Sequence, residues 1–297
     1  MSLVQHIKDF VKLKSQINTL KREFEISRFN QIRLQQALTY QALSRSMHRS
    51  LNKYEFQVFS QNGEDGIILE ILKRLGEPAG YFVEVGIQDG RECNMANLAI
   101  NFGWDGLMLE GDSNYAKSAQ EYFNQKSSSG AGRVNVQNEF ITAENFASLL
   151  SANNVPKNLD VLSIDVDGVD YWIWKSLPSE YRPRLVIVEY NAYLPHQRQI
   201  TVPYEPTFSR YQKHPSGYFF GASLAAFASL GKQKGYSLVA CDSKGANAFF
   251  VRDENIKGQF APLTPADAYF PLTSGTKNRP SATEAFELIK NMPFAEV

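Results

Sequence analysis

The stretch YFVEVGIQDG, residues 81–90, sets an apolar run directly before a turn with two glycines. Tyr, Phe and Val are enriched in strands, so the run predicts a buried β-strand. Gly86 and Gly90 permit a tight turn and a close approach of the backbone to a ligand. The same turn carries three side chains able to make polar contacts: Glu84, Gln88 and Asp89. The stretch therefore predicts a strand that ends at a binding site.

Further β-rich runs follow along the chain. They are GLMLEG (106–111), RVNVQ (133–137), LDVLSID (159–165), RLVIVEY (184–190), YSLVAC (236–241) and ANAFFVR (246–252). Helical stretches separate the first runs, and such alternation predicts a mostly parallel sheet with both faces covered. The last two runs are separated only by DSKG (242–245), which is too short for a parallel crossover. We therefore expect an α/β fold, a Rossmann-like doubly wound sheet of five parallel strands closed by a C-terminal antiparallel hairpin.

The first fifty residues differ from the rest in pattern and charge. Apolar residues recur there at three- and four-residue steps, with Ser27 and Gln31 interrupting the series: Phe10, Leu13, Ile17, Leu20, Phe24, Leu34 and Leu38. This spacing predicts a long amphipathic helix, able to form a coiled coil and to join two copies of the chain. Packing of this helix on its own domain and binding of its basic face to an anionic membrane are the alternatives.

These patterns divide the chain into three parts. Residues 1–50 form the helical arm, residues 51–270 the catalytic domain, and residues 271–297 a tail with one helix. In the tail, Ser281 and Glu284 have the spacing of a capping box.

Composition excludes several classes of protein. With 297 residues, 43% hydrophobic and 21% charged, the chain can bury a core of ordinary size. The arm holds nine Lys and Arg against three Asp and Glu, a net charge of +6, so the remainder carries −6 because the total is zero. An acidic body disfavours nucleic acid as a partner. Cys93 and Cys241 lack metal-type spacing, and no stretch is apolar enough for a signal peptide or a transmembrane span, so we expect a reducing, cytoplasmic setting.

Acidic and polar residues stand where the predicted strands end. Glu110 comes twenty-six positions after Glu84, roughly where a Rossmann-like domain keeps the carboxylate that binds two ribose hydroxyls. The third strand leads to side chains that can meet the edge and face of an adenine: Asn138, Glu139 and Phe140. Ligands bind outside the carboxyl ends of the strands in an open α/β sheet. These residues are therefore candidates for binding a nucleoside-containing cofactor.

The fourth strand ends in LSIDVDGVDY, residues 162–171, with Asp165 and Asp167 one residue apart. Such a pair serves a phosphatase of the haloacid dehalogenase type, a metal-dependent glycosyltransferase or a Rossmann-type transferase. A phosphatase nucleophile would end the opening strand, whereas Asp165 comes late in the sheet. The glycosyltransferase remains an alternative, as does a binding module without catalysis. For Asp167, a cap on the helix that follows is the structural alternative.

In this order and spacing, the motifs FVEVGIQDG (82–90), GLMLEGD (106–112), DVLSIDVDG (160–168) and RPRLVIVEYN (182–191) resemble those of class I S-adenosylmethionine-dependent methyltransferases, within them the FkbM-like branch. The resemblance covers about residues 80 to 252. SQNGEDG (60–66) also looks like the segment that such relatives place over the cofactor, which makes Gln61 a candidate. One position departs from the pattern, because Gln88 replaces the usual middle glycine of the first loop.

The resemblance implies roles for the residues in these motifs. Glu84, Gly86 and Gly90, with Gln88 and Asp89, would line the methionine part of S-adenosylmethionine. Glu110, with Gly111 and Asp112, would bind the ribose, and Asn138, Glu139 and Phe140 the adenine. Asp165 would face the sulfonium and the methyl acceptor.

Three residues near the ends of the fourth and fifth strands are candidates for a metal site. Asp165, Glu189 and Asn191 offer the hard oxygen ligands that Mg²⁺ prefers. The arrangement resembles metal-dependent O-methyltransferases in which acids ending these two strands hold one divalent ion. Asp165, Asp167 and His196 are candidates to accept the proton that an acceptor hydroxyl releases.

Residues 191–220 form a long segment rich in Tyr, Pro and Phe. Loops of this length inside a compact domain are usually functional, so we expect a lid over the site. Its cationic side chains could receive an acidic or phosphorylated acceptor: Arg198, Arg210, Lys213 and His214. Together, the sequence predicts an S-adenosylmethionine-dependent O-methyltransferase that acts with magnesium on a hydroxyl of a saccharide or another small natural product.

Overall fold

The computed structural model describes residues 51–76, 78–127, 131–273 and 279–297. The helices of this part are η2 (Leu51–Tyr54), α2 (Glu64–Leu75), α3 (Ala96–Phe102), α4 (Ser113–Ser127), α5 (Phe146–Ala152), α6 (Asp170–Ser176), α7 (Arg210–Lys213), α8 (Leu224–Lys234), η3 (Asp253–Asn255), α9 (Pro265–Ala268) and α10 (Ala282–Ile289). The strands are β1 (Tyr81–Val85), β2 (Asp105–Glu110), β3 (Val134–Asn138), β4 (Val161–Ile164), β5 (Leu185–Glu189), β6 (Ile200–Thr201), β7 (Tyr236–Cys241), β8 (Asn247–Arg252) and β9 (Ala295–Glu296). The predicted helical arm, residues 1–50, lies outside the described residues.

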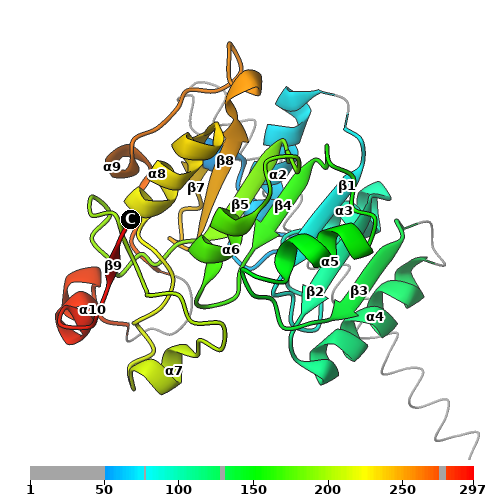
Figure 1. The fold of residues 1–297 in the computed structure, drawn as a ribbon. Helices are drawn as coiled ribbons and strands as arrows, with labels where there is room; N and C mark the ends of the chain where they lie inside the picture. The colour runs from blue at the N-terminus through cyan, green and yellow to red at the C-terminus, as the bar shows by residue number, and fades with distance from the viewer. Residues whose placement is uncertain (1–50, 77, 128–130, 274–278) are drawn as a thin grey trace, which may run out of the picture. The chain divides into compact units, whose positions relative to one another are not determined.

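The central sheet has seven strands in the order β3-β2-β1-β4-β5-β8-β7 (Figure 1). Strands β1 to β5 are parallel, and β8 enters antiparallel between β5 and β7. The strand order reverses at β1, where β2 lies on one side and β4 on the other. The predicted α/β fold, with five parallel strands and a closing hairpin, is confirmed.

Helices cover both faces of this sheet because the strand side chains alternate in direction. One face buries Val83, Leu107 and Ile164 against α5, α6 and α8. The other buries Phe82 and Met108 against α2, α3 and α4. In an open α/β sheet of this kind, ligands bind outside the carboxyl ends of the strands.

Gly86, the first residue after β1, lies against Asp165, the first residue after β4. A Cβ at this position would lie 1.6 Å from the carbonyl oxygen of Asp165, and the backbone has a φ of +81°. Only glycine satisfies both conditions. This contact places the loop after β1 directly beside the acidic end of β4.

The segment before α2 folds back toward the strand ends and is fixed by two buried acids. The Asp65 carboxylate accepts the N–H groups of Val58, Phe59 and Ser60, each at 2.8 Å. Glu64 accepts the backbone N–H of Asn62 at 2.7 Å and the side-chain amide of Asn247, on β8, at 2.8 Å. The predicted SQNGEDG segment thus takes its position from the closing hairpin.

The C-terminal residues add a small layer that the sequence did not predict. Strand β9 pairs antiparallel with β6, which lies within the long segment 191–220. The capping box at the start of α10 is confirmed, since the Ser281 hydroxyl and the Glu284 side chain each bond to the other residue's backbone. The tail therefore packs beside the segment predicted to be a lid.

Candidate functional site

Two cavities open at the carboxyl ends of the parallel strands. The larger has a volume of about 450 Å³ and lies over the ends of β1 and β2. The smaller, of about 180 Å³, lies over the ends of β4 and β5. Both are lined by Gln61, Gly86, Glu92 and Asp165. The two cavities are therefore neighbours in one crevice, with Asp165 on the wall between them.

Glu110 ends β2 on the wall of the larger cavity and is 9% exposed. Its carboxylate accepts the backbone N–H of Gln88 at 2.7 Å and that of Asp112 at 2.9 Å. Each carboxylate oxygen has two lone pairs, so these bonds leave acceptor capacity toward the cavity. Glu110 thus joins the loops after β1 and β2. Its carboxylate can accept hydrogen bonds from hydroxyl groups in the cavity.

Gln88 occupies the turn position where the related motif has glycine. Its φ is +49°, in the left-handed region that glycine adopts most easily. The backbone therefore keeps the glycine conformation, and the Glu110 carboxylate holds the Gln88 N–H in place. At this position the backbone therefore adopts a conformation that glycine also adopts easily.

Glu84 lies inside β1 and lines the smaller cavity rather than the larger. Its carboxylate accepts the N–H groups of Asn94 at 2.8 Å and Met95 at 3.0 Å. Burial raises its pKa to about 7, although these hydrogen bonds oppose the shift. Its carboxylate thus fixes the loop before α3.

The other predicted cofactor residues divide into two groups. Gly111, Asp112 and Phe140 line the larger cavity, and the Phe140 ring is 55% exposed. Four others are not among its lining residues: Asp89, Gly90, Asn138 and Glu139.

The side chains of two of these four residues, Asp89 and Asn138, bond to neighbouring groups in the structure. Asp89 forms an ion pair with Arg91 at 2.6 Å. The Asn138 amide donates to the carbonyl oxygens of Glu110 at 3.0 Å and Gly111 at 3.1 Å. The predicted adenine contact therefore rests on Phe140.

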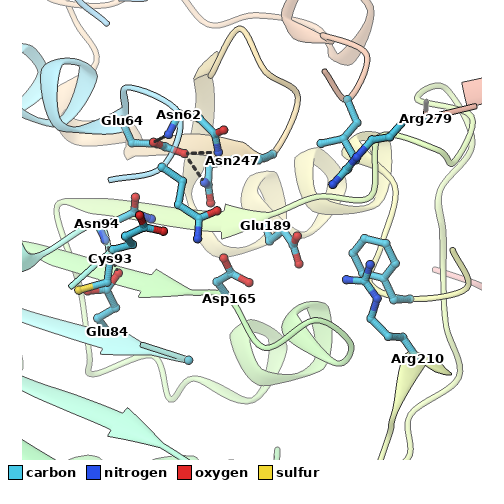
Figure 2. Close-up of a pocket in the computed structure, with 16 residues that line it drawn as sticks. Asn62, Glu64, Glu84, Cys93, Asn94, Asp165, Glu189, Arg210, Asn247 and Arg279 are labelled. Atoms are coloured by element: carbon cyan, nitrogen blue, oxygen red, sulfur yellow. Dashed lines mark hydrogen bonds between the residues drawn. The ribbon is translucent and has the colours of Figure 1, made fainter. Parts of the chain in front are cut away.

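Acidic side chains gather in the smaller cavity. Figure 2 shows the carboxylates of Asp165 and Glu189 pointing toward the same space. Ligand atoms of Asp165, Asp170 and Glu189 all lie within 4.8 Å of one another. Burial, and next the neighbouring carboxylates, raise the pKa values of Asp165 and Glu189 well above their usual range. Such a set favours a bound cation, which would offset this repulsion.

The side chain of Asn191, the third predicted metal ligand, makes three hydrogen bonds with nearby backbone groups. Its amide donates to the carbonyl oxygens of Tyr218 and Phe220, each at 2.9 Å, and its Oδ1 accepts the N–H of Tyr193 at 2.9 Å. Because these bonds turn the side chain toward the 218–220 backbone, the structure brings Asp170, rather than Asn191, to the acids.

Asp170 was not identified from the sequence. It begins α6, and its carboxylate accepts the N–H groups of Val166 at 2.8 Å and Gly168 at 3.0 Å. It therefore shapes the loop that carries Asp165. The only sequence signal for it was an acid in the first turn of the helix after that loop.

Asp167 neither caps α6 nor joins this acidic set. Its φ is +55°, and its carboxylate forms an ion pair with Arg210. The helix has no side-chain cap at its N-terminus. Asp165 and Asp167 therefore have different surroundings. Asp165 belongs to the three-acid set, whereas Asp167 forms an ion pair with Arg210.

His196 lies away from the described cavities. Its ring stacks on Tyr269 with centroids 4.4 Å apart, and burial lowers its pKa. It lines neither the larger nor the smaller cavity. The structure therefore does not bring this predicted proton acceptor to Asp165.

Residues 191–220 supply walls to both cavities, as a lid would. Pro206 and Phe208 line the larger cavity, and Arg210 and Phe220 line the smaller. Arg279, which no sequence pattern indicated, also lines the smaller cavity.

Among the described residues, no helix has both the length and the apolar character to cross a membrane.

Comparison with known proteins gives low similarities. No family model matches the chain, and no curated protein matches it. Among solved structures, magnesium protoporphyrin IX methyltransferase from Synechocystis PCC 6803 with bound SAM is 12% identical over 64% of this chain and 77% of that chain, with a TM-score of 0.40. A S-adenosylmethionine-dependent methyltransferase from Clostridium acetobutylicum is 11% identical over 73% of this chain and 98% of that chain, with a TM-score of 0.39. At similarities this low, we infer function from the site residues alone.

Proposed function

We propose that the protein is an S-adenosylmethionine-dependent O-methyltransferase of the FkbM-like type, assisted by a divalent cation and acting on a hydroxyl of a saccharide or another small natural product. The observation that carries the proposal is the pair of cavities that share Asp165 at the switch point of the sheet. A methyl donor and an acceptor must meet in one crevice, and this arrangement offers one compartment for each.

The larger cavity suits S-adenosylmethionine in size and in chemistry. Its volume of about 450 Å³ lies within the roughly 300–1,000 Å³ of small-molecule sites. Glu110 offers a carboxylate for the ribose hydroxyls, and Phe140 offers an exposed aromatic face for the adenine. When bound, the cofactor supplies a methyl group activated by a sulfonium.

The acids of the smaller cavity suit a divalent cation. Glu189 Oε2 is buried and has no hydrogen-bond partner among the described residues, which is costly unless a cation or ligand binds it. Asp165 and Glu189 would hold the ion, with Asp170 behind them. When bound, a cation lowers the pKa of a coordinated hydroxyl and so favours its nucleophilic form.

The chain's own residues would then orient the acceptor and receive its proton. Asp165 stands on the wall shared by both cavities, so a hydroxyl beside it faces the donor compartment. Holding two reactants in line can supply about 7–11 kcal/mol of the barrier reduction. Asp165 or Glu189 would accept the released proton. Pro206 and Phe208 would exclude water from the donor side.

The test is isothermal titration of the protein with S-adenosylhomocysteine. We expect binding that weakens by about tenfold or more in Glu110→Ala, since a charged hydrogen-bonding partner contributes about 1.5–3 kcal/mol. Glu139→Ala is the matched control, because this nearby acid does not line the cavity. Equal affinities in wild type and Glu110→Ala would refute the placement of the cofactor.

A further inference from the structure

Two guanidinium groups line the smaller cavity together with its acids. Arg210 begins α7, and Arg279 precedes α10. Figure 2 shows both on the side of the cavity opposite Glu84 and Cys93, with Asp165 and Glu189 between. The proposed acceptor compartment is thus acidic on one side and cationic on the other.

Arg210 is held in a fixed position at the cavity. Its guanidinium carbon lies 4.3 Å from the centroid of the Phe220 ring, its Nη1 pairs with Asp167, and its side chain is 23% exposed. Its Nε has no hydrogen-bond partner among the described residues. The only ion-pair partner described for Arg210 is the exposed carboxylate of Asp167. The guanidinium of Arg210 can therefore donate further hydrogen bonds to a ligand.

Arg279 brings a second cation to the same region. Both arginines line the smaller cavity, and the charges of Arg279 and Arg210 both lower the pKa of Tyr193, which burial raises overall. Pairs of arginines at one cavity match the oxygens of a carboxylate or a phosphate, because each guanidinium can bind two oxygens at once.

The other cations that the sequence suggested for this role are used elsewhere. Arg198 pairs with Glu296 at 2.5 Å, and Lys213 pairs with Glu205. His214 bonds to Ser216 through Nδ1 at 2.8 Å. None of these three lines the smaller cavity.

We infer that the acceptor carries an anionic group, a carboxylate or a phosphate, which Arg210 and Arg279 bind while its hydroxyl faces Asp165. The inference rests on the proposed function, since it takes the smaller cavity as the acceptor compartment. At about 180 Å³ the cavity is below the usual size of a ligand site, so it holds only the reacting ring and its charged group.

The experiment measures binding of three sugars to the protein saturated with S-adenosylhomocysteine and Mg²⁺. The probes are glucuronate, glucose 6-phosphate and neutral glucose, which distinguish a carboxylate from a phosphate. We expect at least one anionic probe to bind about tenfold or more tightly than glucose. In Arg210→Met and Arg279→Met this preference should fall by a similar factor, whereas Arg198→Met should keep it.

Equal binding of the three sugars, no binding of either anionic probe, or an unchanged preference in both cavity variants would overturn the inference. Arg210→Lys separates charge from geometry, because it keeps the cation and loses the two-point contact. Binding of S-adenosylhomocysteine is measured first in every variant. A failure of the wild type at that step counts against the proposed function, while a failure only with the sugars counts against the anionic acceptor.

Discussion

Asp165 is the residue on which both compartments depend. Its backbone carbonyl contacts Gly86, and its carboxylate joins those of Asp170 and Glu189. Its pKa is raised well above the usual range, first by burial and then by nearby acids. A divalent cation would replace the protons that these acids otherwise retain.

A metal titration tests this at the level of single residues. We expect Mn²⁺ to bind the wild type. Its affinity for Asp165→Asn should be lower by at least roughly 10–100-fold, which is the loss found when residues behind a metal ligand are changed. Asp89→Asn is the control, since this acid pairs with Arg91 at the surface. If Mn²⁺ bound wild type and Asp165→Asn alike, the cation would have no place in the smaller cavity.

The sequence indicated some of these residues and missed others for physical reasons. Glu110 and Asp165 could be identified because strand ends fix where a side chain emerges. The surroundings of Asn191 could not be predicted, because its amide bonds to the 218–220 backbone, far along the chain. Arg279 was missed for the same reason, since a position in a connecting segment carries no periodic signal.

At the scale of elements, the site depends on the close contact of the β1 loop with the end of β4. The positive φ of Gly86 and its distance from Asp165 both demand glycine. The alternation of the strands was readable from the sequence, as was the hairpin that follows from a short connection. The pairing of β9 with β6 could not be predicted from the sequence, because strands of two residues have no pattern of their own.

Gly86→Ala tests this contact against a matched glycine. We expect a loss of about 3 kcal/mol or more in the free energy of unfolding, because backbone strain adds to a clash that the two strands cannot relieve. Gly235→Ala, where φ is +80° and nothing lies within 4 Å of the added Cβ, should cost only about 1–2 kcal/mol. Urea denaturation measures both, and equal losses would show that the contact is unimportant.

At the scale of the whole molecule, the described part of the chain buries several acids around the crevice. Burial raises the pKa of Glu84 and of Asp242 to about 7 and that of Asp170 to about 6, from ordinary values of 4.5 and 3.8. Between the ordinary and the raised values, the folded protein holds protons that the unfolded chain has released. The free energy of unfolding therefore falls as pH rises through this range and levels off above it.

We expect the protein without ligands to be more stable to urea at about pH 5 than at about pH 8. Asp242→Asn should reduce the slope of this dependence by about one proton, since it removes one of the shifted groups. Ser237→Ala, at the far end of β7, should leave the slope unchanged. Stability that rises with pH over the same interval would contradict the protonation of these acids in the folded state.

The most direct measurement is a crystal structure of the protein with S-adenosylhomocysteine. We expect the ribose hydroxyls at the carboxylate of Glu110, the adenine against Phe140, and the sulfur directed at the wall formed by Asp165. A ligand bound elsewhere, or a larger cavity that stays closed to it, would contradict the proposed function.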